Sequence, residues 1–183
     1  MAKWTSKKLK LKEGHGWTAK PGHKIFIADR GAVRFDIPDT WVAVPAAKSF
    51  QLYDRPQPHD ECRLEVSVMY LPPGIDFSEL PVARALAEVM AAEKRDVIGR
   101  SELVHAPRPD FDLAWIETRY HEGEPPREAR TRTCLARQGV IQPLITMDFW
   151  ASDAEQFTPV WDEVLRSLQL GMRVDDPTHR KLN

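Results

Sequence analysis

The chain is poor in the features that would mark export, membrane insertion or disulfide cross-linking. It has two cysteines, Cys62 and Cys134, among 183 residues. No window approaches the ~20 consecutive apolar residues that a membrane helix needs, and the first residues lack the apolar stretch of a secretion signal. We therefore expect a cytoplasmic protein without a membrane span, whose two thiols are free and buried.

Signatures of catalysis and of metal binding are also missing from the sequence. There is no phosphate-binding glycine loop, no dinucleotide fingerprint, no G-x-S-x-G elbow and no H-E-x-x-H motif. His59, Asp60, Glu61 and Cys62 follow one another, but neighbours on an extended chain point to opposite sides and rarely converge on one ion. We expect no metal, no cofactor and no enzymatic activity.

The charge is unevenly distributed along the chain. The net charge is −1, yet residues 1–24 carry seven lysines and one glutamate, which is +6, and leave −7 for the remainder. We divide the chain into a basic N-terminal arm (1–23), one domain (24–171) and a polar C-terminal tail (172–183). Apolar residues at 42% and charged residues at 29% are ordinary for a globular domain.

Two tryptophans, Trp4 and Trp17, lie among the lysines of the arm. Aromatic side chains between cations suit stacking on nucleic-acid bases or contact with an anionic surface. They also suit docking of the arm onto the domain or onto a second copy of the chain, which would give a homodimer. We favour docking, because an exposed tryptophan in a free tail lowers solubility.

Alternation of apolar and polar residues predicts most of the domain to be β-strand. Residues 25–28 and 33–37 read as a hairpin around Asp29-Arg30-Gly31. Residues 111–121 read as one long strand, and its first half, 111–116, is apolar on both faces, which predicts a strand covered by two layers. Further strands are predicted at residues 49–54, 61–71, 101–105, 128–137 and 140–150.

Two segments have helical spacing of their apolar residues. The first runs from an N-cap at Ser78 to Gly99. The second begins with Ser152 and Glu155 in capping-box spacing and ends at Gly171; Pro159 either starts a fresh helix or kinks this one. Sheet and helices together predict an α+β fold, an α/β/α sandwich with an antiparallel sheet of about six or seven strands and a helix on each face.

Three features resemble the PsbP-like superfamily: the strand and turn Phe35–Trp41, the helix between sheet strands, and the closing strand and helix over residues 144–168. This superfamily includes the extrinsic photosystem II subunit, a Ran-binding import factor family, bacterial domains of unknown function and chaperones for secreted toxins. The resemblance spans about residues 24–170 and implies an antiparallel sheet flanked by helices in a bacterial member of unknown function. It implies no catalytic residue, since the members mostly bind other proteins.

Arginines are the best candidates for a binding site within the domain. Arg130 and Arg132 share one face of a predicted strand, and Arg119 falls on its neighbour. Guanidinium groups match planar anions, so this set suits a phosphate or an acidic partner. It equally suits a solvated face that pairs with Glu117, Glu128, Glu61 and Glu65 across the sheet, and we favour the paired face.

Three functions follow from these observations. We favour a non-catalytic binding module, an adaptor or chaperone for another protein, with Arg119, Arg130, Arg132, Trp4 and Trp17 as binding residues. The alternative is a small-molecule or lipid-binding protein with an enclosed apolar pocket between sheet and helix. The third is a hydrolase-like enzyme in which His121 acts as a general base beside Glu122 or Glu124.

Overall fold

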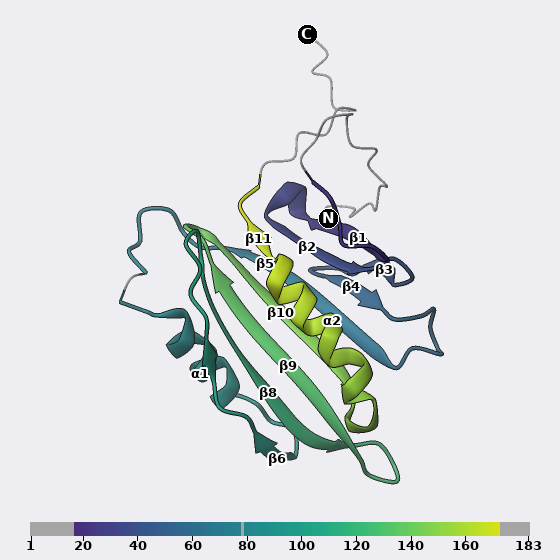
Figure 1. The fold of residues 1–183 in the computed structure, drawn as a ribbon. Helices are drawn as coiled ribbons and strands as arrows, with labels where there is room; N and C mark the ends of the chain where they lie inside the picture. Colours follow the sequence, from purple (N-terminus) through teal and green to yellow (C-terminus); the bar gives the residue numbers. More distant parts are fainter. Residues whose placement is uncertain (1–16, 78, 173–183) are drawn as a thin grey trace.

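The computed structural model describes residues 17–77 and 79–172, which form two antiparallel sheets and two helices (Figure 1). The main sheet has the strand order β3-β4-β5-β10-β9-β8-β6, and β7 also pairs with β8. Its strands are β3 (Val42–Pro45), β4 (Phe50–Tyr53), β5 (Cys62–Tyr70), β6 (Val97–Arg100), β7 (Val104–His105), β8 (Asp112–Glu122), β9 (Arg127–Arg137) and β10 (Ile141–Trp150).

A separate sheet of three strands contains the predicted N-terminal hairpin. It consists of β1 (His23–Ala28), β2 (Val33–Pro38) and β11 (Gln169–Leu170) in the order β1-β2-β11. The antiparallel pairing is confirmed, but one sheet of six or seven strands is wrong: the main sheet has eight strands and the hairpin lies outside it. The short strands β3, β6 and β11 have too few residues for alternation to show them.

The two helices lie on opposite faces of the main sheet (Figure 1). α2 (Ala154–Ser167) covers one face through the larger core, in which Trp161 packs with Phe149 and with Phe35 of β2. α1 (Val82–Ala91) covers the other face through Leu86 and Met90. The predicted two-sided strand is confirmed, since β8 contributes adjacent residues to both clusters.

Both predicted helices need corrected boundaries. α1 ends at Ala91, and Val97, the apolar residue that suggested a longer helix, belongs to strand β6. The proposed cap Ser78 lies outside the described residues. The capping box is wrong, because α2 begins at Ala154 without a side-chain cap and Ser152 lies in the 3-10 turn η2 (Ala151–Asp153). Pro159 lies within a single helix.

Neither end of the main sheet offers a regular edge. The Ala46 amide donates to the Ser49 carbonyl, so alternate residues of β3 face its neighbour and Ala43 and Pro45 face outward. Pro45 has no N–H to donate. At the other end, the pairing of β6 with β8 shifts register between Val97 and Gly99. Such devices oppose the addition of another strand.

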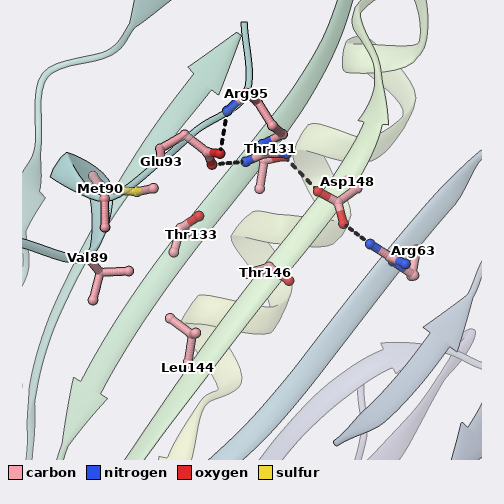
Figure 2. A pocket seen from close by; sticks show the side chains of 11 residues that line it. Arg63, Val89, Met90, Glu93, Arg95, Thr131, Thr133, Leu144, Thr146 and Asp148 are labelled. Carbon is pink, nitrogen blue, oxygen red and sulfur yellow. Dashed lines mark hydrogen bonds and ion pairs between the residues drawn. The ribbon is translucent and has the colours of Figure 1, made fainter. Parts of the chain in front are cut away.

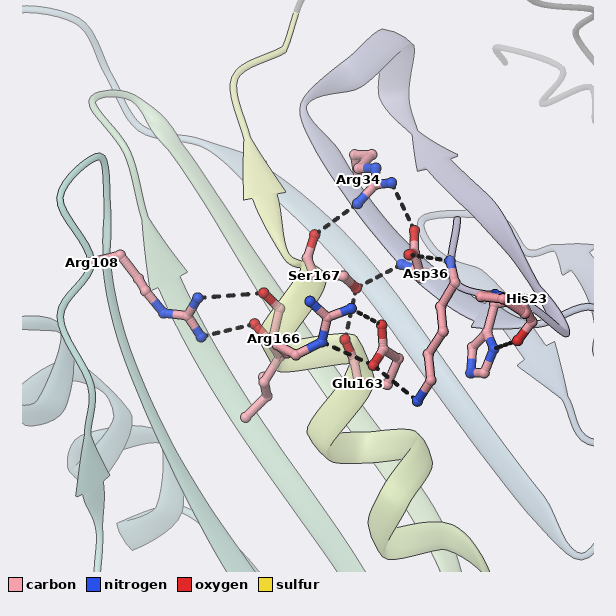
Figure 3. Close-up of polar contacts among 10 residues, drawn as sticks. His23, Arg34, Asp36, Arg108, Glu163, Arg166 and Ser167 are labelled. Carbon is pink, nitrogen blue, oxygen red and sulfur yellow. Dashed lines mark hydrogen bonds and ion pairs between the residues drawn. The ribbon is translucent and has the colours of Figure 1, made fainter. Parts of the chain in front are cut away.

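A buried ion pair joins the small sheet to the end of α2 (Figure 3). Arg34 Nη2 lies 2.7 Å from Asp36 Oδ1, and both side chains are less than one-tenth exposed. Arg34 also donates to the Ser167 carbonyl, and the Asp36 amide donates to Ser167 Oγ at 2.8 Å. The segment before β1 closes the site, because the Lys20 amide donates to Asp36.

Glu163 extends this cluster on the last turn of α2. It is buried, and its carboxylate accepts hydrogen bonds from Arg166 and lies 3.6 Å from Lys20 Nζ. The hydrogen bond from Arg166 holds the pKa of Glu163 below its ordinary value. Arg108 donates to the Leu165 carbonyl from the other side, so cations surround the carboxyl end of α2 (Figure 3).

Removing one partner of the buried pair should destabilise the fold strongly. We expect Asp36→Ala to lower the free energy of unfolding by about 3–5 kcal/mol, because it strands the Arg34 charge in the interior. The double replacement Arg34→Met with Asp36→Leu should recover most of the loss, since it removes both charges. Urea unfolding of the three proteins measures this, and a double variant as unstable as Asp36→Ala would contradict it.

Candidate functional site: the open sheet face

The helices cover the two faces of the main sheet unequally. α1 packs against β8 and β9 and reaches β10 at Leu144, and no helix of the described residues packs against β5, β4 and β3 on that side. We call this surface the open sheet face. Cross-strand register places the following residues on this side of the sheet, from β3 to β9: Val42, Val44, Gln51, Tyr53, Arg63, Glu65, Thr131, Thr133, Thr146 and Asp148. Of these, Tyr53, Thr131 and Thr133 are buried.

A row of paired polar groups crosses the centre of the open sheet face. Arg63 donates to Asp148 at 2.8 Å, and Thr131 Oγ1 donates to the other oxygen of Asp148 at 2.6 Å. Arg95, in the loop after α1, donates to Thr131 at 2.8 Å and to Glu93 at 2.5 Å. Two cations and two carboxylates therefore neutralise one another within the surface (Figure 2).

Beside this row, an open groove of about 380 Å³ lies between the carboxyl end of α1 and the sheet (Figure 2). Its floor carries three threonines, Thr131, Thr133 and Thr146. Its wall is apolar where Val89, Met90 and Leu144 meet. Arg63, Glu93, Arg95 and Asp148 complete the lining together with Ala92.

The loop that closes one end of the groove is fixed by Glu93 and Arg95. Glu93 accepts hydrogen bonds from the backbone amides of Lys94 and Arg95, and the Arg95 guanidinium lies 4.1 Å above the centre of the Tyr120 ring. The hydrogen bond from the Arg95 side chain lowers the pKa of Glu93 to about 2. Burial raises the pKa of Tyr120. The carboxylate of Glu93 is thus ionised at every physiological pH.

Exposed apolar side chains border the polar centre. Val42 and Val44 of β3 are 36% and 41% exposed, Met69 of β5 is 41% exposed, and Val89 on α1 is 45% exposed. Met69 pairs with Gln142 across the sheet and so shares the open sheet face. These side chains leave apolar area accessible to solvent at the border of the polar centre.

The arginines singled out from the sequence lie on the opposite face, beside α2. Arg130 and Arg132 both pair with Glu117, at 3.2 and 2.8 Å, and Arg132 is buried and also donates to Thr158 of α2. Arg119 lies opposite Arg130 in the register, 4.0 Å from Glu128, with its side chain 46% exposed. Glu117 and Glu128 are among the acids expected to pair with these arginines.

His121 lies outside the groove, at the far end of β8. Its Nδ1 lies 4.0 Å from Asp96, and both side chains are exposed. Neither Glu122 nor Glu124 is its ion-pair partner among the described residues. Within residues 17–77 and 79–172, no acid makes a side-chain hydrogen bond to His121, and the groove beside α1 does not include this histidine.

The remaining sequence candidates are placed only in part. Trp17 is partly buried, and Trp4 lies outside the described residues. Both thiols are buried, and burial raises the pKa of Cys134 to about 12 and that of Cys62 further. Within residues 17–77 and 79–172, no three His, Cys, Asp or Glu side chains gather as metal ligands, and no helix is long and apolar enough to cross a membrane.

The fold defined by this sheet and its two helices is that of the PsbP-like proteins. The solution structure of cyanobacterial PsbP from Synechocystis sp. PCC 6803 matches with a TM-score of 0.58 at 11% identity, over 86% of this chain and 98% of that one. A crystal structure from Bacteroides thetaiotaomicron VPI-5482 matches with a TM-score of 0.59 at 13% identity, over 82% of this chain and 49% of that one. This chain therefore spans about half the length of the second protein.

Within that fold the chain belongs to the Alr1449 family, whose model matches residues 24–174. It is 44% identical to the uncharacterized protein alr1449 of Nostoc sp. (strain PCC 7120) over 176 residues, which cover 96% of this chain and 91% of the relative. The resemblance to PsbP-like proteins of unknown function is thus confirmed.

The position of Arg95 should control the titration of Glu93. We expect Arg95→Gln to raise the midpoint of Glu93 from about 2 toward its ordinary value near 4.5, since the main hydrogen bond to the carboxylate is lost. Carboxyl NMR measures the midpoint, and Arg84→Gln on the exposed side of α1 is the control.

The same shift predicts a pH dependence of stability. The pKa of Glu93 is lower in the folded state than in the unfolded state, so its stabilisation is complete above pH ~4.5 and is lost as the pH falls toward 2. Arg95→Gln should flatten unfolding stability over this range. An unchanged midpoint and slope in Arg95→Gln would contradict the assignment.

Proposed function

We propose that this protein is a non-catalytic binding module, an adaptor or chaperone, that holds another protein against its open sheet face. One observation carries the proposal: the surface of β5, β4 and β3 on the α1 side lacks a helical cover among the described residues and carries exposed Val42, Val44 and Met69. Members of the PsbP-like superfamily mostly bind other proteins, which supports the same role.

The mode of binding follows from the ends of the main sheet. Pro45 and the register shift in β6 oppose strand addition there. A partner would instead lie across the side chains of the open sheet face. Arg63 and Asp148 would then orient the bound partner but add little to its affinity, because each charge already has an ion-pair partner within this chain.

A small-molecule role is the second candidate, favoured by the groove itself. Its volume of about 380 Å³ lies within the range of ligand sites. Its threonine floor and open mouth differ from the enclosed apolar pocket that a lipid carrier needs. The exposed position of His121 supports neither candidate and gives hydrolysis no site.

A matched pair of variants tests the open sheet face. We expect Val44→Asp to weaken partner binding at least tenfold, since a buried carboxylate at a contact surface is not compensated. Val104→Asp is the control: its parent side chain is equally exposed, at 40%, but lies on the Trp115 side of the sheet. Partners captured from an extract of the source organism are identified by mass spectrometry and then titrated against both variants.

Arg119→Ala belongs in the same panel, because the arginine face stays a predicted site for an acidic partner. Its affinity should remain near that of the unmodified protein. A tenfold loss in Arg119→Ala, with Val44→Asp unaffected, would move the site to the α2 side.

The arm of residues 1–23 stays a prediction, as do the domain limits, the tail from residue 172 and the cytoplasmic location.

If the arm docks onto a second copy, a chain without residues 1–16 should be monomeric where the full chain is dimeric. Light scattering after gel filtration measures both. Equal masses and equal partner affinity for the two chains would rule out docking of residues 1–16 onto a second copy, and loss of binding to DNA or to anionic vesicles in the shorter chain would favour the alternative role.

A further inference from the structure

The groove beside α1 has the chemistry of a site for an uncharged ligand. Its four charged side chains form two pairs, Arg63 with Asp148 and Arg95 with Glu93. A charged ligand would have to break one of these pairs or approach a group of its own sign. A neutral ligand faces no such penalty.

The groove also offers hydrogen-bonding groups that the chain leaves unused. Thr133 and Thr146 are cross-strand neighbours on its floor, and neither hydroxyl makes a hydrogen bond to a side chain in the part of the chain that the structure describes. Each hydroxyl can donate one hydrogen bond and accept others. A ligand with both amide N–H and carbonyl groups matches these two hydroxyls.

An apolar wall stands next to the hydroxyls. Val89 and Met90 of α1 face Leu144 of β10 across the groove (Figure 2). Val89 is 45% exposed, so the wall gains apolar contact when a side chain enters. The open mouth continues onto the open sheet face and leaves room for a chain to enter and leave.

We propose that the groove binds an extended, uncharged polypeptide segment of the partner, with main-chain amides at Thr133 and Thr146 and one apolar side chain at Val89, Met90 and Leu144. This rests on the proposed function and names the part of the partner that the open sheet face selects. An enclosed site would suit a free small molecule better, because ligand pockets bury most of their ligand.

End-blocked hexapeptides of Gly and Ser with one central Leu, Glu or Lys provide the probes. We expect the Leu peptide to shift the methyl NMR signals of Val89, Met90 and Leu144, with an affinity that is equal at 50 and 500 mM NaCl. Thr133→Val and Thr146→Val should each weaken binding about three- to tenfold. Thr118→Val is the matched control, because that hydroxyl is buried and unpartnered in the structure and lies outside the groove.

Several results would overturn this inference. One is the absence of methyl shifts with the Leu peptide. Another is binding of the Glu or Lys peptide with the affinity of the Leu peptide and with a dependence on salt. A third is binding of N-acetyl-leucine amide with the same affinity as the Leu peptide. The capture experiment separates the two proposals. If Val44→Asp loses partner binding and no peptide binds, the proposed binding module stands and the peptide site in the groove is contradicted. If peptides bind but Val44→Asp captures partners normally, the open sheet face is contradicted as the partner site.

Discussion

The buried pair of Arg34 and Asp36 is the interaction on which the rest of the arrangement depends. It joins β2, near the start of the domain, to Ser167 at the end of α2, more than 130 positions along the chain. Through it the last turn of α2 is held while its apolar side packs on the main sheet. The small sheet then shields that side, so the molecule presents its uncovered strands on the opposite face.

Because α2 and the small sheet cover only one face of the main sheet, the two faces differ in the polarity of their side chains. On the α2 side, even charged residues serve packing: Arg132 is buried between Glu117, Thr158 and the rings of Trp115 and Phe149. On the other side, α1 is short, and within the described residues no helix packs against β5, β4 and β3. The polar groups there pair among themselves, which lets a sheet face stay hydrated without a cover.

Sequence periodicity identified the long strands and missed the short ones. Strands β5, β8, β9 and β10 have nine to eleven residues, and alternation identified all four. β3 and β6 have four residues each, and Val97 of β6 continues the helical spacing of α1 closely enough to conceal the break. That break depends on Glu93, whose carboxylate receives two backbone amides that no local pattern reveals.

The candidate site was harder to foresee than the fold. Arg119, Arg130 and Arg132 were selected because they share one face of two neighbouring strands, and the register places that face on the α2 side. Arg63, Arg95 and Asp148 are distant in sequence and stand near no motif, so only three-dimensional pairing joins them. Thr133 and Thr146 became visible as a pair once β9 and β10 were aligned.

The irregular edge strands of the main sheet, β3 and β6, bear on aggregation at high protein concentration. Pro45 and the irregular β6 interrupt the regular backbone hydrogen-bond ladder on which fibrils grow. Association through the edges of this sheet is therefore disfavoured, and contacts with its surface are made by side chains. We therefore do not expect two copies of this chain to associate by exchanging strands of this sheet.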